Sequence, residues 1–141
     1  MTDYKILLND YSLRLLKALA HLEYSFQKVQ NLSFHVAELD DEQLEAWEGF
    51  VSRFSRASDL FVTKYLKSYI LNEDPAFDGT LRDSLNRAEK YRLIEDTQIW
   101  LEIRSLRNAV AHDYDEGRLE KNLKRIRELA PIVLKIKNVL K

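Results

Sequence analysis

Three observations predict an all-α protein, a four- to five-helix bundle of up-down antiparallel helices with short connections. Only 3 glycines and 2 prolines punctuate the 141 residues. The residues between them are rich in leucine, glutamate, lysine, arginine and alanine, which favour helix. Apolar residues recur at three- and four-residue steps, so they share one face of a helix. At this length we expect a single domain, residues 1–141, whose core needs no cross-links.

Two long helices are predicted first, and they should pair antiparallel. The first runs over about residues 3–30, and a connection over residues 31–38 follows. The second begins at Asp40 or Asp41, either of which can cap it, and continues to about Leu71. Their apolar stripes are Leu8, Tyr11, Leu15, Leu19, Leu22, Phe26 and Val29 in the first helix, and Leu44, Trp47, Val51, Phe54, Phe61 and Tyr65 in the second.

A loop over residues 72–79 separates these helices from shorter ones. Thr80, followed three residues later by Asp83, resembles a capping box and predicts a short third helix to about Tyr91. A fourth helix should start near Glu95 or Asp96. Its core-facing stripe is Ile99, Ile103, Leu106 and Val110.

The last helix is predicted after a break at Gly117. Leu119, Leu123 and Ile126 begin its apolar stripe. Because proline lacks a backbone N–H and clashes with the preceding turn, Pro131 should kink or interrupt this helix.

The composition argues against several kinds of chemistry. The chain has no cysteine, which removes thiol catalysis and thiolate metal sites and suits a reducing compartment. His21 and His35 have no second ligand at metal spacing, and there is no glycine-rich phosphate loop. We therefore expect no metal and no cofactor.

The sequence also gives no sign of a membrane or of secretion. Asp3 stands where a secretory signal would be positively charged. No apolar run approaches the roughly 20 residues that cross a bilayer. We expect a soluble, unprocessed, cytoplasmic protein without membrane contact.

Charge is unevenly distributed, although the net charge is only −1. Residues 118–141 carry eight basic and two acidic groups, so 8 − 2 = +6. Glu38, Asp40, Asp41, Glu42, Glu45 and Glu48 form an acidic run. The basic segment suits a polyanion and the acidic run a basic partner, or both are ordinary solvated helix faces.

One stretch, residues 106–114, gathers the most useful side chains. At about 100° per residue, Asn108 and His112 fall about 180° and 220° from Ile99, away from the core stripe. Arg104, Asn108 and His112 form one row, with Arg107 on its flank. Arg107 and His112 are about 140° apart. Three alternatives could still bring these two residues into one site: the helix is less tightly wound near its end, the long Arg107 side chain curves around the helix, or the site is completed across a dimer.

Trp100 and Leu101 fall towards the same outward side of the fourth helix. Apolar residues there predict a second covering surface, and the economical candidate is another copy of the chain packed by a two-fold axis. Two Arg107/His112 sets would then face one cleft. Trp47 and Trp100 are interpreted as core or interface residues rather than base-stacking platforms.

A histidine and an arginine together suffice for metal-free cleavage of RNA. Histidine transfers protons near neutral pH, and arginine supplies a permanent charge suited to a phosphate. In this hypothesis the 2′-hydroxyl attacks, His112 transfers the proton, Arg107 stabilises the added charge and Asn108 orients the phosphate or the histidine. From the residues alone, a histidine that favours a helix C-terminus is the simpler alternative.

The run Arg107-Asn108-Ala109-Val110-Ala111-His112-Asp113-Tyr114 matches the RxxxxHxY signature. The chain thereby resembles HEPN-domain proteins, in the subgroup of HepT toxins. Its helical organisation, its length and the proline in the last helix are also similar to that family.

The resemblance implies a HEPN-like domain that forms a homodimer with a metal-independent ribonuclease site. Arg107 and His112 become catalytic and Asn108 supportive. It implies a small MNT-type nucleotidyltransferase antitoxin as partner, which silences the toxin by adding AMP to Tyr114. Added bulk and negative charge two residues from His112 would exclude an RNA phosphate.

Some relatives imply other functions. They are described as substrate-binding partners of nucleotidyltransferases, without established nuclease activity. A third interpretation is a bundle whose motif only stabilises a dimer.

Further residues are possible contributors to the site. Arg53, Arg56 and Asp59 of the second helix are either site residues or ordinary exposed charges. Possible RNA contacts are Arg104, Lys121, Lys124 and Arg125, and Arg127 belongs to the same basic helix, which would guide RNA towards the cleft.

Overall fold

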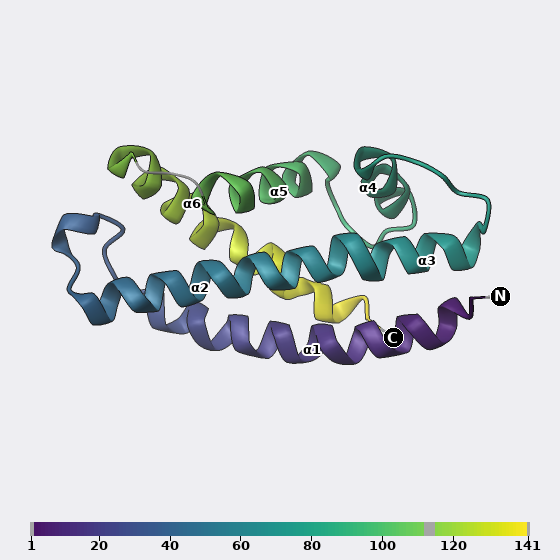
Figure 1. The fold of residues 1–141 in the computed structure, drawn as a ribbon, viewed down its shortest axis with the longest axis horizontal. Helices are drawn as coiled ribbons and strands as arrows, with labels where there is room; N and C mark the ends of the chain where they lie inside the picture. Colours follow the sequence, from purple (N-terminus) through teal and green to yellow (C-terminus); the bar gives the residue numbers. More distant parts are fainter. Residues whose placement is uncertain (1, 112–114, 141) are drawn as a thin grey trace.

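The computed structural model describes residues 2–111 and 115–140, with the backbone alone at 108–111. All regular elements in these two ranges are helical, which confirms the predicted all-α bundle (Figure 1). In chain order they are α1 (Tyr4–Val29), α2 (Asp41–Asp59), α3 (Leu66–Glu73), α4 (Leu81–Lys90), α5 (Thr97–Ala111) and α6 (Glu116–Leu134).

The two long helices form the base of the molecule. Asp3 caps α1, and its carboxylate accepts hydrogen bonds from the backbone N–H groups of Lys5 and Ile6. Asp40 and Gln43 form a reciprocal capping box at the start of α2. The helix that starts with α2 runs on through α3 as one continuous rod beside α1 (Figure 1).

The middle of that rod is a π-helical turn, Leu60–Tyr65, between α2 and α3. Such a turn adds a residue to the helical repeat and is frequent at functional sites. The hydroxyl of Thr63 donates to the carbonyl oxygen of Asp59 at 2.7 Å. Phe61, Val62 and Tyr65 of this turn are all buried. The predicted second helix is thus confirmed, but the π turn within it was not expected.

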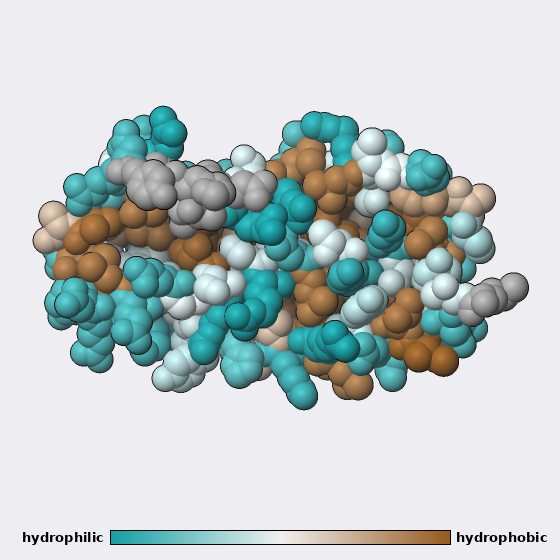
Figure 2. All heavy atoms as spheres, in the orientation of Figure 1, coloured by the Kyte–Doolittle hydropathy of each residue, from teal (hydrophilic) through white to brown (hydrophobic). Residues whose placement is uncertain are grey.

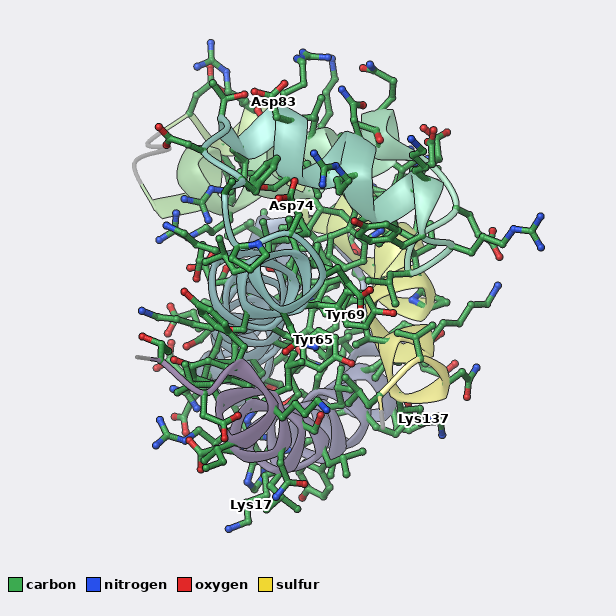
Figure 3. The ribbon with its side chains drawn as sticks, turned by 90° about the vertical axis from the view of Figure 1, so that its right-hand side faces the viewer. Lys17, Tyr65, Tyr69, Asp74, Asp83 and Lys137 are labelled. Atoms are coloured by element: carbon green, nitrogen blue, oxygen red, sulfur yellow. The ribbon has the colours of Figure 1, made fainter. Side chains whose placement is uncertain are left out.

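The core lies between the long pair and the shorter helices above it. Its largest fully buried side chains include Phe50, Phe54 and Phe61. Tyr65 and Tyr69 point into the interior, whereas Lys17 and Lys137 project outward (Figure 3). Burial, with Tyr69 nearby, raises the pKa of the Tyr65 hydroxyl.

One prediction about the last helix is wrong. Gly117 is not a break: α6 begins at Glu116, because the Asp115 carboxylate accepts from the Arg118 N–H at 3.2 Å and caps the helix. Pro131 lies inside the last helix as predicted, and of its two predicted effects interruption does not occur, because α6 continues to Leu134 before a 3-10 turn, Lys135–Asn138. Pro131 lies on the exposed side of the helix. Water can therefore donate a hydrogen bond to the carbonyl oxygen one turn earlier, which lacks an N–H donor because proline has none.

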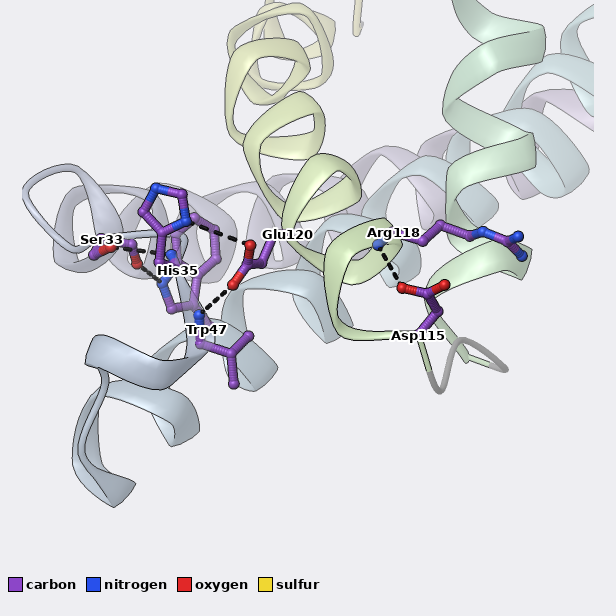
Figure 4. A network of polar contacts seen from close by, with 7 residues as sticks. Ser33, His35, Trp47, Asp115, Arg118 and Glu120 are labelled. Carbon is purple, nitrogen blue, oxygen red and sulfur yellow. Dashed lines mark hydrogen bonds and ion pairs between the residues drawn. The ribbon is translucent and has the colours of Figure 1, made fainter.

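The connection between α1 and α2 is fixed by α6. Glu120 accepts from the Val36 N–H at 3.0 Å and lies 3.3 Å from Nδ1 of His35 (Figure 4). Trp47 donates its indole N–H to the Ser33 carbonyl at 2.9 Å. Contacts from two helices therefore hold the connection, including its 3-10 turn, Val36–Glu38.

Candidate functional site

One carboxylate of α2 holds two arginines of α5. Nε of Arg107 lies 2.7 Å from Oδ2 of Asp59, and Nη1 of Arg104 lies 2.8 Å from Oδ1. The Asp59 side chain is 28% exposed, and those of Arg104 and Arg107 are 30% and 34% exposed. Asp59, Arg104 and Arg107 together carry two positive charges and one negative charge, a formal sum that suits a phosphate.

The long second helix positions Asp59. Asp59 is the last residue of α2, and the π turn starts directly after it. The Thr63 hydroxyl bond to its carbonyl ties Asp59 to that turn. The carboxylate thereby reaches α5, which packs against α2, α4 and α6.

The other motif side chains cannot be placed. His112 and Tyr114 lie outside the described residues, and so does the Asn108 side chain. In the sequence, His112 directly follows the last residue of α5, and Asp115 caps α6. The structure thus brings Arg104, Arg107 and Asp59 together, and the positions of the remaining motif groups stay predictions.

Two arginines expected to guide RNA make contacts inside the fold. Arg125 donates to both oxygens of Glu102, at 2.7 and 2.9 Å, and ties α6 to α5. These bonds lower the pKa of Glu102 and raise that of Arg125. Arg127 donates to the carbonyl oxygens of Val29 and Leu32 at 2.8 and 2.7 Å, at the end of α1.

Other basic residues of the prediction remain at the surface. Lys121 and Lys124 of α6 are exposed. The ammonium group of Lys124 lies 5.6 Å from the centroid of the Phe34 ring. Arg118 is also exposed, so a basic strip remains along the first half of α6.

The charges of the second helix have different roles. Arg53 donates to the His21 carbonyl at 3.1 Å and to the Ser25 hydroxyl at 2.7 Å, which links α2 to α1. Arg56 is exposed. Of the three charges considered from the sequence, only Asp59 contacts the motif among the described residues.

Trp100 is a core residue, one of the two alternatives that the sequence left open. Its side chain is 3% exposed, and its ring centroid lies 5.1 Å from that of Phe61 in the same chain. Leu101 is half-buried and packs against the core. The reason is that α5 contacts three helices, so its apolar arc is wider than a single stripe. The surface that covers Trp100 therefore belongs to the same chain, and the burial of Trp100 gives no reason to expect a second copy.

Among the described residues, no three His, Cys, Asp or Glu side chains are grouped so that they could hold a metal ion. Within the same part of the chain, no helix has both the length and the apolar character to span a bilayer.

Comparison with protein families identifies a relationship that covers most of the chain. Residues 12–141 match the family described as nucleotidyltransferase substrate binding protein like. The match includes the motif at residues 107–114 and all of α2 to α6. A comparison with curated proteins gives no match. The chain therefore belongs to the nucleotidyltransferase substrate-binding-like family, a family of HEPN-like helical proteins.

Proposed function

We propose that the protein is a metal-independent endoribonuclease, the toxin of a pair whose antitoxin is a nucleotidyltransferase. The observation that supports this proposal is the Arg107–Asp59 ion pair at 2.7 Å. This ion pair holds the side chain of Arg107, the first residue of the RxxxxH signature. His112 follows Arg107 by five positions in the sequence. A guanidinium in this place carries a permanent charge for the scissile phosphate.

The proposed reaction is transesterification within the RNA. The 2′-oxygen attacks the adjacent phosphorus, and the bond from phosphorus to the 5′-oxygen breaks. His112 takes the proton of the 2′-hydroxyl, and a proton is returned to the leaving 5′-oxygen. Arg107 stabilises the extra negative charge on the phosphoryl oxygens, with Asn108 in a supporting role. The products are a 2′,3′-cyclic phosphate and a 5′-hydroxyl.

The proposed regulation is addition of AMP to Tyr114 by the partner. The family match supports a nucleotidyltransferase partner, because the family is described by that association. Tyr114 follows His112 by two residues, so its adenylylation would place a phosphate next to the histidine. Mass spectrometry of protein treated with the partner and ATP should find AMP on Tyr114. AMP at another residue contradicts the assignment.

The second candidate function is that of a non-catalytic subunit that binds the substrate of a nucleotidyltransferase. The family description favours it directly. It predicts a wild-type protein that co-purifies with the nucleotidyltransferase but cleaves no RNA. The ribonuclease proposal predicts cleavage by the isolated chain.

Two alanine variants test the ribonuclease proposal. Arg107→Ala and His112→Ala should each lower the rate of RNA cleavage at least about 100-fold and remove toxicity on expression. Arg82→Ala, at an exposed position of α4, is the matched control and should cleave like wild type. Circular dichroism should show all variants folded. Cleavage retained in both motif variants would contradict the mechanism.

A further inference from the structure

A cavity of about 400 Å³ opens beside Arg107, between α2, α6 and the 3-10 turn after α1. This volume lies within the range of about 300–1,000 Å³ that is typical of small-molecule sites. Most of its wall is apolar and includes Trp47, Val51, Leu119 and Leu123. Figure 2 shows hydrophobic surface at the end of the molecule where the α1–α2 connection and the start of α6 lie.

The polar groups of the cavity follow one side of α2. Glu48, Ser52 and Ser55 line it at steps of four and three residues, the spacing of one helical face. Asp59, one turn beyond Ser55, holds Arg107, which also lines the cavity. The polar residues that line the cavity thus run from the acidic Glu48 at one end to Ser55 and the basic Arg107 at the other.

The ends of this polar line differ in charge and lie far enough apart for one nucleotide. Glu48 and Ser55 are separated by seven residues, or about 10 Å along a helix. That length is close to the distance from the phosphate of a nucleotide to the outer edge of its base. The apolar wall between the two ends suits the flat faces of a nucleobase.

We propose that this cavity, the base pocket, binds the nucleobase of a nucleotide whose phosphate lies on Arg107. The proposal rests on the function proposed above, because that function assigns phosphate binding to Arg107. The nucleotide comes either from an RNA strand or from a free mononucleotide, and the chemistry that is recognised is the same.

Glu48 gives the base pocket a preference among bases. An ionised carboxylate only accepts hydrogen bonds, so it favours a base edge that carries an amino group. Adenine, guanine and cytosine carry one, whereas uracil presents two carbonyl oxygens around a single N–H group. The base pocket therefore selects amino-bearing bases over uracil.

The two tryptophans allow binding to be measured directly by NMR of their indole N–H groups. Trp47 lines the base pocket, while Trp100 lines a separate cavity of about 440 Å³ near the C-terminal end of α6. Titration with AMP should move the Trp47 signal and leave that of Trp100 in place. UMP should bind at least tenfold more weakly. The variant Trp100→Phe assigns the two signals.

Matched variants test the location and the base preference. Ser52→Phe, at an exposed position on the cavity rim, should weaken AMP binding at least tenfold. Asn86→Phe, at an exposed position of α4, should bind like wild type. Glu48→Gln should reduce the preference for AMP over UMP, because an amide also donates. Glu45→Gln, outside the cavity wall, should keep it.

A dinucleotide with a 2′-deoxy sugar at its 5′ position, which cannot be cleaved, separates the two sources of the nucleotide. A Trp47 shift with AMP supports a free mononucleotide, and a shift with the dinucleotide alone supports an RNA strand. A Trp47 signal that responds to neither overturns the base pocket, as does wild-type binding by Ser52→Phe.

Cleavage assays on the same preparations keep the two proposals apart. Cleavage without any Trp47 shift overturns the base pocket and leaves the ribonuclease proposal in place. A Trp47 shift in a protein that cleaves no RNA supports the base pocket and contradicts the ribonuclease.

Discussion

Asp59 makes the contacts that give the motif arginine a fixed position. Its two oxygens accept from Arg104 and Arg107, at 2.8 and 2.7 Å. A charge shared in this way restrains both guanidinium groups more than a solvated side chain would be restrained. Sequence reasoning named Asp59 only together with Arg53 and Arg56, since helical spacing gives no contact between separate helices.

Replacing Asp59 tests whether this restraint matters for the reaction. Asp59→Asn keeps the shape of the side chain but removes its charge, so Arg107 should lose its fixed orientation. We expect kcat for RNA cleavage to fall about tenfold or more with a smaller change in KM. Asp41→Asn, at an exposed position in the first turn of α2, is the control. An unchanged kcat in a folded Asp59→Asn protein would show that the ion pair is only structural.

At the scale of helices, α6 stabilises the fold through its contacts in addition to carrying exposed basic residues. Arg127 bonds to two carbonyl oxygens at the end of α1 and lies 5.1 Å from the centroid of the Trp47 ring. Sequence reasoning placed this residue among basic groups that guide RNA. Its contacts are with the protein, because carbonyl groups at the end of a helix lack the N–H donors of a following turn and accept from a side chain instead.

Removing the Arg127 side chain should destabilise the protein without a change in the motif. Arg127→Ala removes the guanidinium donor from the Leu32 carbonyl group and leaves the Val29 carbonyl group with the Leu32 backbone N–H, so the free energy of unfolding should fall by about 2 kcal/mol. Urea denaturation measures this loss. Lys124→Ala, one turn earlier and exposed, should change it by less than about 0.5 kcal/mol. Equal stabilities of the two variants would rule out the proposed role.

The pairing of α5 and α6 should depend on pH. Hydrogen bonds from Arg125 lower the pKa of Glu102 in the folded protein, so its unfolded form binds protons more readily. The resulting stability is present above the ordinary glutamate pKa of about 4.3 and is lost as the pH falls through the lower folded value.

Glu102→Gln provides the comparison for this pH dependence. The side chains of Glu102 and Arg125 are both more than a third exposed. The free energy of unfolding of wild type should therefore exceed that of the variant by at most about 1 kcal/mol at pH 7. The difference should shrink in acid. Denaturation of both proteins at several pH values between about 3 and 7, a range that includes the ordinary glutamate pKa, measures this difference in the free energy of unfolding. A difference that persists in acid would assign the effect to something other than ionised Glu102.

The helices themselves could be predicted well, and their irregularities could not. Hydrophobic periodicity and the Thr80–Asp83 capping box located α1 to α4 to within a few residues. Phe61 and Tyr65 of the π turn, Leu60–Tyr65, have the four-residue spacing that is also typical of an ordinary α-helix, so hydrophobic periodicity does not reveal the turn. Trp100 was assigned to an outward face because a helical projection assumes one neighbour, while α5 has three.

At the scale of the whole molecule, we propose that the site is half of a two-fold arrangement. Arg107 and His112 are about 140° apart on an ideal helix, which favours completion of the site by a second copy. The burial of Trp100 within one chain removes one reason to expect that copy. The homodimer therefore remains a proposal supported by the motif alone.

Mixing two inactive variants tests a shared site. If each site takes Arg107 from one copy and His112 from the other, a mixed dimer of Arg107→Ala and His112→Ala retains one intact site. The mixture should regain activity that neither variant has alone, and analytical ultracentrifugation should show a dimer. A monomeric, fully active wild-type protein would exclude the shared site.

The chemical ends of the RNA products test the central claim most directly. Cleavage of a defined RNA in the presence of a metal chelator should leave 2′,3′-cyclic phosphate and 5′-hydroxyl ends, as measured by mass spectrometry. A single 2′-deoxy substitution at the cleaved position should stop the reaction there, and Arg107→Ala should form the products at least about 100-fold more slowly. Ends with a 5′-phosphate, or cleavage beside the 2′-deoxy sugar, would contradict attack by the 2′-hydroxyl.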